Sequence, residues 1–396
     1  MQMPRVRWLL GAIAIVGLAG LLSVAQGENG ATPGVTDTEI KIGGFIAQSG
    51  PVAGIGIPVA RGAEAWYNWV NDTFGGVHGR KINFIVCDDA FDPARSVACY
   101  KKLVEEDQVF AIVHPLGTIT LAAVFQDMVA SGIPVVSPHA NATFLSIPTQ
   151  PNVFALQPNN VTFATVLARY ARNDLGAQRI AIVYSDDAFG AELRDAFVAE
   201  LSAQGVEPVA TLAHAPTETD FSAIALRLKQ AEPDAVALLT YLQPTAAIIV
   251  AANDVGLAPR WLATNTATDP ALFALLGDPS LADGLVAPGF AVDPTLDTLA
   301  TVQFRHILQK YFPDETPGGF SLIAYVGAQL MTEGLIRAGR DLTREKFIDA
   351  MNTIFEWSSN LTPPITYTPE DHRGIKSLWI IEARGGTFVV VKTVEG

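Results

Sequence analysis

Short apolar runs alternate with longer amphipathic stretches along most of this chain, and the alternation occurs in two successive series. Such alternation is typical of β-α-β units, which build parallel sheets covered by helices. The first series predicts strands at Ile40–Phe45, Ile82–Cys87, Phe110–His114 and Pro134–Ser137. The second predicts strands at Arg179–Tyr184, Val206–Leu212, Ala235–Tyr241 and Trp261–Thr264. We therefore expect two α/β sheets, and with them two lobes.

Predicted helices lie between these strands, over residues 59–70, 93–105, 121–130, 163–175, 191–204, 221–230 and 245–255. The two series are interrupted near residues 153–158 and 284–289, which suggests that the chain crosses between lobes there. Three further helices are predicted over residues 298–311, 321–338 and 344–352, followed by strands over 376–383 and 387–393. Doubly wound sheets bind ligands at the carboxyl ends of their strands, so the loops after the strands are candidate sites.

The first residues have the pattern of a secretory signal. Arg5 and Arg7 precede an apolar run from Trp8 to Val24, and Ser23-Val24-Ala25 suits a signal peptidase. We expect a signal peptide over residues 1–25 and a periplasmic or extracellular mature protein. The alternative is an uncleaved N-terminal anchor, because the apolar run approaches bilayer-spanning length. Export makes disulfides permissible.

The charge and the motifs exclude several function classes. The net charge of −14 argues against nucleic-acid binding, which needs a basic surface. The chain has no G-x-S-x-G, H-E-x-x-H or phosphate-loop motif, so we expect no enzyme activity and no cofactor. The pairs Asp88-Asp89 and Asp186-Asp187 could bind a metal or act as acid and base. Solvated strand ends or helix caps are the commoner explanation of such pairs.

Cys87 and Cys99 are the only cysteines in the chain. Cys87 ends a predicted strand, and Cys99 lies at the edge of the apolar stripe of the following helix. The ends of such a strand-turn-helix unit can come close enough for a bridge, so we predict a disulfide. Two buried thiols are the alternative. No histidine has zinc-ligand spacing to these cysteines, and no metal site is expected.

Polar residues follow the strands of the first series. Gly117 and Thr118 open a predicted helix, whose free backbone N–H groups suit a carboxylate. The Thr118 hydroxyl could add a hydrogen bond, although it could instead only cap the helix. Further candidates at strand ends are Ser49, His139 and Asn141 in the first series and Phe189, Tyr241 and Asn265 in the second. An aromatic residue in such a loop can equally serve packing alone.

Several short motifs occur in a characteristic order and spacing. They include Ser49-Gly-Pro-Val-Ala53, Asp88-Asp89 with Asp92-Pro93, Ser137-Pro138, Phe189-Gly190-Ala-Glu192 and Asp283-Gly284. From Glu39 to about Phe388 the chain resembles the leucine/isoleucine/valine receptors of bacterial ABC importers, which are type I periplasmic binding proteins. The resemblance implies two doubly wound, Rossmann-like α/β lobes joined by three crossover segments. Lobe 1 would comprise residues 37–155 and 288–361, and lobe 2 residues 156–287 and 362–396.

The resemblance also implies roles for individual residues. The ligand carboxylate would be held at Gly117 and Thr118, and the loop with His139 and Asn141 would support both carboxylate and ammonium. Asn265 stands where the family usually has an acidic partner for the ammonium. The first-lobe aromatic of the family matches Ile55 here, and a late aromatic wall matches Phe320. The expected ligand is therefore a branched-chain amino acid or a related small carboxylate or amide.

We expect an extracytoplasmic solute-binding receptor of an ABC importer, which closes around its ligand by hinge motion. Its partners would be the solute and the transmembrane permease subunits, and we expect it to act as a monomer. Two alternatives use the same fold: an exported amidase or hydrolase, and a ligand-sensing domain. Fold analogy alone does not decide among them.

Overall fold

A computed structural model describes residues 32–395; the predicted signal peptide, residues 1–25, lies outside the described residues. The first sheet is fully parallel, with strand order β2-β1-β3-β4-β5. Its strands are β1 Glu39–Phe45, β2 Lys81–Cys87, β3 Ala111–Val113, β4 Val135–Val136 and β5 Val153–Phe154. The predicted first series is confirmed, and β5 adds a two-residue strand where only a crossing was expected.

The second sheet has the order β12-β11-β10-β9-β8-β6-β7. Its strands are β6 Ile180–Ser185, β7 Ala210–His214, β8 Ala235–Leu239, β9 Arg260–Ala263, β10 Val286–Gly289, β11 Ser377–Arg384 and β12 Thr387–Glu395. The last two form an antiparallel hairpin that continues the parallel part of the sheet through β10. The stretch near residues 284–289, predicted only as a crossing, therefore also contributes a strand.

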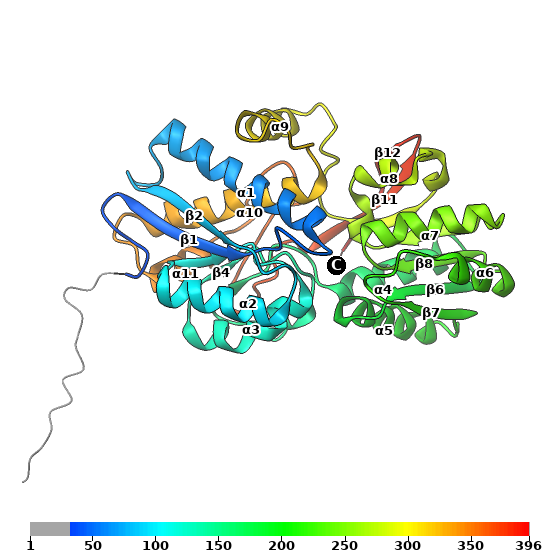
Figure 1. The fold of residues 1–396 in the computed structure, drawn as a ribbon. Helices are drawn as coiled ribbons and strands as arrows, with labels where there is room; N and C mark the ends of the chain where they lie inside the picture. Colours follow the sequence, from blue (N-terminus) through cyan, green and yellow to red (C-terminus); the bar gives the residue numbers. More distant parts are fainter. Residues whose placement is uncertain (1–31, 396) are drawn as a thin grey trace, which may run out of the picture. The chain divides into compact units, whose positions relative to one another are not determined.

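Helices flank both sheets (Figure 1). Their bounds are α1 Ala53–Phe74, α2 Pro93–Lys101, α3 Thr118–Ser131, α4 Asn160–Asn173, α5 Ala188–Ala203, α6 Ser222–Ala231, α7 Leu242–Asp254, α8 Ala271–Leu276, α9 Leu299–Tyr311, α10 Gly319–Ala338 and α11 Arg344–Met351. A π-helical turn, η1 Lys102–Glu106, extends α2. The short helices α8, η2 Thr143–Leu145, η3 Asn265–Thr268 and η4 Pro279–Ala282 were not predicted, because too few residues form each to show a helical period.

The late helix α10 packs against α1, next to the first sheet. The two helices approach closely at Gly62, where an added Cβ would lie 2.1 Å from the Ser321 carbonyl oxygen. Trp66 then packs edge-on to Tyr325 at 5.1 Å and donates to the Thr332 hydroxyl at 3.0 Å. Among the described helices α10 alone has the length and apolarity of a membrane span, and 67% of that apolar stretch is buried. We interpret α10 as a core helix.

Three segments that link the two sheets are hydrogen-bonded to one another. The Ala155 N–H donates to the His372 carbonyl at 3.1 Å, and the Gly374 N–H donates back to Ala155 at 2.8 Å. The Val292 N–H donates to the Leu361 carbonyl at 2.9 Å. This arrangement confirms the predicted fold class of two α/β lobes joined by three crossover segments. The lobe boundaries at residues 155/156, 287/288 and 361/362 stay predictions.

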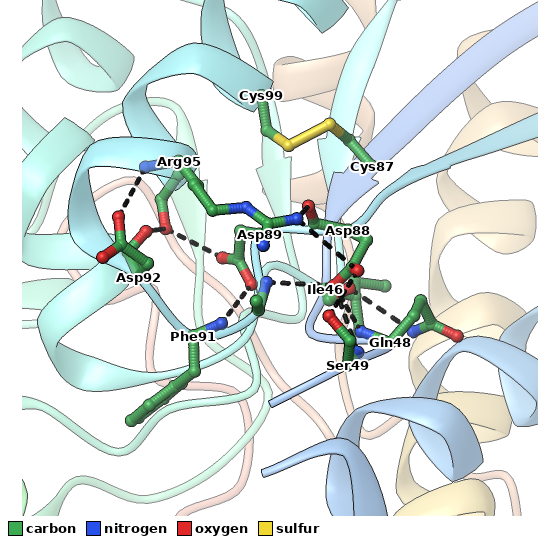
Figure 2. A network of polar contacts seen from close by, with 12 residues as sticks. Ile46, Gln48, Ser49, Cys87, Asp88, Asp89, Phe91, Asp92, Arg95 and Cys99 are labelled. Carbon is green, nitrogen blue, oxygen red and sulfur yellow. Dashed lines mark hydrogen bonds and ion pairs between the residues drawn. A yellow bond between two sulfur atoms is a disulfide. The ribbon is translucent and has the colours of Figure 1, made fainter. Parts of the chain in front are cut away.

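The predicted disulfide is confirmed. Cys87 at the end of β2 is bonded to Cys99 in α2, with 5.7 Å between the two Cα atoms (Figure 2). The bridge ties the last residue of a strand to the helix that follows it. It thereby closes the turn at residues 88–92, which lies at the carboxyl edge of the first sheet.

Candidate functional site

A cleft lies where strands of both sheets end. Its empty space, including the opening to solvent, is about 750 Å³. We call the residues that follow strands of the first sheet the first wall: Phe91, Leu116, Gly117, Thr118, His139, Ala140 and Asn141. The second wall follows strands of the second sheet: Phe189, Tyr241, Asn265, Thr266, Thr268 and Asp269. Val52 and Ile55 near the start of α1, Gln157 in a crossover segment, and Gly319, Phe320 and Ile323 of α10 complete the lining.

The start of α3 forms the centre of the first wall. Gly117 precedes the helix with a φ of 101°, and its N–H donates to the His139 carbonyl at 3.1 Å. The Thr120 hydroxyl donates to the Gly117 carbonyl at 2.8 Å. Thr118 is the first helical residue and makes no capping hydrogen bond, so the interpretation of Thr118 as only a cap is wrong. Its hydroxyl and the free N–H groups of the first turn suit a carboxylate.

Two histidines lie at and behind the first wall. His139 lines the cleft, and its Nε2 has no hydrogen-bond partner in the part of the chain that the structure describes. Burial lowers the pKa of His139 to about 3, so its imidazole is neutral and brings no positive charge to the cleft. His114 lies behind it, with 5.6 Å between the centroids of the two imidazole rings. His114 Nε2 forms a hydrogen bond with the Tyr67 hydroxyl at 3.1 Å. Burial, together with His139, also holds the pKa of His114 well below its usual value.

Asn141 joins the first wall to a crossover segment. Its amide nitrogen donates to Gln157 Oε1 at 3.1 Å and to the Pro158 carbonyl at 2.8 Å. Both amide protons are thereby used, so the side chain can offer a ligand only its oxygen. The Asn141 oxygen is compatible with the predicted support of a ligand ammonium, and a donor for a carboxylate from this loop would have to be His139.

An aromatic pair forms the centre of the second wall. Phe189 and Tyr241 stack with 4.8 Å between centroids and 24° between ring planes. The Tyr241 hydroxyl donates to Asp187 at 2.9 Å, and Asp187 caps α5 through the Gly190 N–H. Burial and the nearby Asp187 carboxylate raise the pKa of Tyr241, so its hydroxyl stays protonated. The pair therefore offers a fixed aromatic surface to a ligand.

Asp269 is a cleft residue that the sequence analysis missed. Its side chain accepts the N–H of Ala271 at 2.8 Å and of Gly319 at 2.6 Å, which connects the second wall to the start of α10. Only 7% of Asp269 is exposed, and burial raises its pKa. Asn265, four residues earlier, also lines the cleft. An Asp-Pro pair precedes α8 at residues 269–270, as Asp92-Pro93 begins α2, and this pattern could have identified Asp269 as a residue at a helix start.

Eight of the nine predicted ligand-binding residues line the cleft, and Ser49 does not. The Ser49 hydroxyl donates to Asp88 at 2.7 Å (Figure 2). Burial raises the pKa of Asp88, but this hydrogen bond and those from the Gln48, Ala90 and Ser49 N–H groups outweigh it and lower the pKa to about 2. Ser49 therefore supports the turn beside the cleft. Among residues 32–395, no three His, Cys, Asp or Glu side chains gather as a metal site.

The comparisons with known proteins agree with this fold and cleft. A sequence profile of the periplasmic binding protein family matches residues 39–387. The chain is 26% identical over 332 residues to "Leu/Ile/Val-binding protein homolog 3" of Brucella melitensis, covering 84% of this chain and 85% of that protein. It is 28% identical over 301 residues to "Leu/Ile/Val-binding protein BraC3" of Rhizobium johnstonii, covering 76% and 80%.

Solved structures show the same fold. A fatty acid ABC transporter substrate-binding protein from Thermomonospora curvata matches with a TM-score of 0.83 at 24% identity, over 92% of this chain and 94% of that one. A branched-chain amino-acid ABC transporter protein from Thermus thermophilus, with bound valine, matches with a TM-score of 0.82 at 21% identity, over 91% and 96%. The chain belongs to the type I periplasmic binding proteins, in the family of the branched-chain amino-acid receptors.

Proposed function

We propose that this protein is the extracytoplasmic receptor of an ABC importer and captures a small solute that carries a carboxylate or an amide. The cleft carries the proposal, because it joins helix-start donors of one sheet to an aromatic pair and a carboxylate of the other. The related proteins are solute-binding proteins, which supports capture of a solute. Branched-chain amino acids and related acids or amides are the candidate ligands.

The chemistry of the two walls suggests how such a solute would be oriented. No lysine or arginine is among the described residues that line the cleft, so a carboxylate would be held by neutral donors. These are the first N–H groups of α3, the Thr118 hydroxyl and the His139 imidazole. An ammonium or amide N–H would face the oxygens of Asn265, Asp269 and Asn141. The apolar body would pack on the Phe189–Tyr241 pair and on Phe320.

Hinge closure is the mechanism that we propose for capture. Each wall offers half of the hydrogen bonds, so affinity would depend on bringing the walls together. A direct contact between the two sides supports this: the Glu192 carboxylate on α5 accepts the N–H of Thr143 in η2 at 2.9 Å. Glu192 also accepts from the Asn160 side chain at 2.7 Å. The closed form would be the one that the permease subunits bind.

A screen tests the proposed ligand class. Amino acids, their amides and matching carboxylic acids are added to the mature protein, and a true ligand should raise the unfolding midpoint by mass action. Thr118→Ala should then lower the affinity measured by calorimetry by about 1.5–3 kcal/mol, the usual contribution of a hydrogen bond to a charged group. Thr162→Ala, in the first turn of α4 and outside the cleft lining, should leave it unchanged.

A second experiment tests the mechanism and separates it from the hydrolase alternative. Small-angle scattering with and without the ligand should show a smaller radius of gyration in the complex. Mass spectrometry of the released solute should find it chemically unchanged. A tight ligand that leaves the radius of gyration constant, or that is recovered as a hydrolysis product, would show that the receptor proposal is wrong.

A further inference from the structure

Phe91 has an unusual backbone conformation at the edge of the cleft. It and Ala90 are consecutive non-glycine residues in the left-handed region, with φ values of 63° and 49°. Left-handed backbone in a bulky residue is rare, and it persists only where the surrounding structure enforces it. Phe91 is half-buried and lines the cleft, next to the helix start at Gly117.

Carboxylates hold this turn from within. Asp88 accepts the Ala90 N–H at 2.9 Å, and Asp89 accepts the Phe91 N–H at 3.0 Å (Figure 2). Asp89 is fully buried and also accepts the Ser96 hydroxyl at 2.8 Å. Each left-handed residue thus has its N–H fixed by a separate carboxylate, and the acidic pair has a structural role in the turn.

Two further connections fix the ends of the turn. The disulfide between Cys87 and Cys99 ties the strand residue directly before the turn to α2. Asp92 caps α2 through the Arg95 N–H at 2.9 Å. The position of Phe91 is therefore set from the preceding strand and from the following helix.

The ring of Phe91 covers the helix start that would hold the carboxylate. An added Cβ on Gly117 would lie 2.3 Å from Phe91 Cε2, so the ring occupies the space that the missing side chain leaves. A glycine at position 91 would adopt the left-handed backbone with less strain. The presence of a strained phenylalanine is explained if its aromatic side chain is needed at this place in the cleft.

We propose that Phe91 is a specificity-determining residue that selects solutes with an extended apolar body over short ones with the same charged group. The proposal rests on the proposed function of the cleft as a carboxylate-binding site. Phe91 adds an apolar surface beside Ile55 and Leu116 on the first side, while the Phe189–Tyr241 pair provides one on the second. A solute held at the α3 start would lie against Phe91 only if its body extends beyond the carboxylate.

The test uses two pairs of probes that differ only in the body. L-leucine is compared with L-alanine, and 4-methylpentanoate with propanoate, so that each pair shares its charged groups. Calorimetry of the mature protein should show a preference for the larger member. Phe91→Ala should weaken binding of the larger member by about tenfold and of the smaller by less than about threefold. Phe91→Leu keeps an apolar side chain and should give intermediate discrimination. It also keeps the test possible if the alanine variant does not fold.

Phe312→Ala is the matched control, because Phe312 is half-buried, packs against Arg61 and is outside the cleft lining. It should leave both affinities unchanged. Equal losses for both members in Phe91→Ala, or no loss for either, would overturn the specificity role while the proposed function stands. A wild-type protein that binds neither pair would refute the small-carboxylate function, and this inference with it.

Discussion

The two walls of the cleft differ in their backbone. In the first wall and directly beneath it, a non-glycine residue in the left-handed region follows each of three strands of the first sheet: Phe91 after β2, His114 after β3 and Ser137 after β4. In the second wall the residues that precede α5, α7 and η3 are extended: Asp187, Tyr241 and Thr264, with φ values of −144°, −78° and −77°. The first wall is therefore strained and the second is not.

Hydrogen bonding is incomplete on both sides. Beneath the first wall, the Ser137 hydroxyl and His114 Nδ1 are buried without a partner among residues 32–395, and in the second wall the same holds for Asn265 Oδ1. The aromatic pair of the second wall is held by the hydrogen bond from Tyr241 to Asp187. Left-handed non-glycine residues cost of order 1–3 kcal/mol each, so the first wall is stabilised by its surroundings in one geometry. We conclude that the first wall depends on a strained backbone held by its surroundings, whereas the second is held by hydrogen bonds such as that from Tyr241 to Asp187.

The strongest way to break the first wall is Gly117→Ala. The residue has a φ of 101°, and the new Cβ would lie 2.3 Å from the Phe91 ring. Backbone strain and overpacking together should lower the free energy of unfolding by about 4 kcal/mol and abolish ligand binding. Denaturant unfolding and calorimetry measure the two effects.

Gly132→Ala, at the other end of α3, separates these causes. Gly132 is also left-handed, with a φ of 65°, but no atom lies within 4 Å of an added Cβ. This variant should lose only about 1 kcal/mol and keep its affinity. A loss in Gly117→Ala no larger than in Gly132→Ala would show that the first wall tolerates change.

The second prediction concerns the covalent support of the first wall. Replacing both Cys87 and Cys99 by serine should lower the free energy of unfolding by about 2–3 kcal/mol, because the 12-residue separation gives a short closed loop. No disulfide supports the second wall, so the loss should be concentrated in the first sheet. Hydrogen exchange should show faster opening of residues 87–99 than of residues 185–190. Two labelled thiols in unreduced, denatured wild-type protein would refute the bridge.

The sequence predicted the repeating elements better than the details of the cleft. Long strands such as β1 and β6 were found because their apolar runs are clear, whereas the four residues of β10 were taken only for a crossing. Seven cleft residues were found from one rule, that ligands bind where parallel strands end, and Phe320 was found from the family resemblance. The rule says nothing of side-chain direction, and so Ser49 was included although its hydroxyl bonds to Asp88.

Residues that reach the cleft from outside the strand ends were harder to predict. Gln157 comes from a crossover segment and Asp269 follows a short 3-10 helix, so neither has a place in a strand-and-helix period. Phe91 occupies the cleft because of two left-handed residues, and no glycine or asparagine marks that turn in the sequence. The strain that distinguishes the first wall is therefore not visible from the residue types.

The third prediction uses pH to compare the walls. His139 has a folded-state pKa of about 3, below the usual value near 6.5, so the unfolded state binds a proton first on acidification. Its contribution to stability is complete above pH 6.5 and is lost as the pH falls toward 3. Between pH 7.5 and 5 the loss from this residue should be about 2 kcal/mol. His139→Gln should remove that part of the pH dependence, and replacing the exposed His306 by glutamine should not.

Asp269 should respond in the opposite sense. Its pKa is raised in the folded state, so protonation favours folding, and the stabilisation is lost as the pH rises through the folded-state value. Asp269→Asn should therefore make the loss of stability on acidification steeper, whereas His139→Gln should make it shallower. If both variants shift the profile in the same direction, the electrostatic difference between the walls is refuted.

The smallest effect is expected from Tyr241→Phe in the second wall. The substitution removes the hydrogen bond to Asp187 and keeps the ring that stacks on Phe189. Asp187 still caps α5 through the Gly190 N–H, so the loss of stability should be about 1 kcal/mol. Ligand affinity should change by less than about threefold, because the ring and not the hydroxyl forms the wall. A tenfold loss of affinity with unchanged stability would mean that the hydroxyl contacts the ligand directly, and the second wall would then hold the solute through a fixed polar group, as we propose for the first.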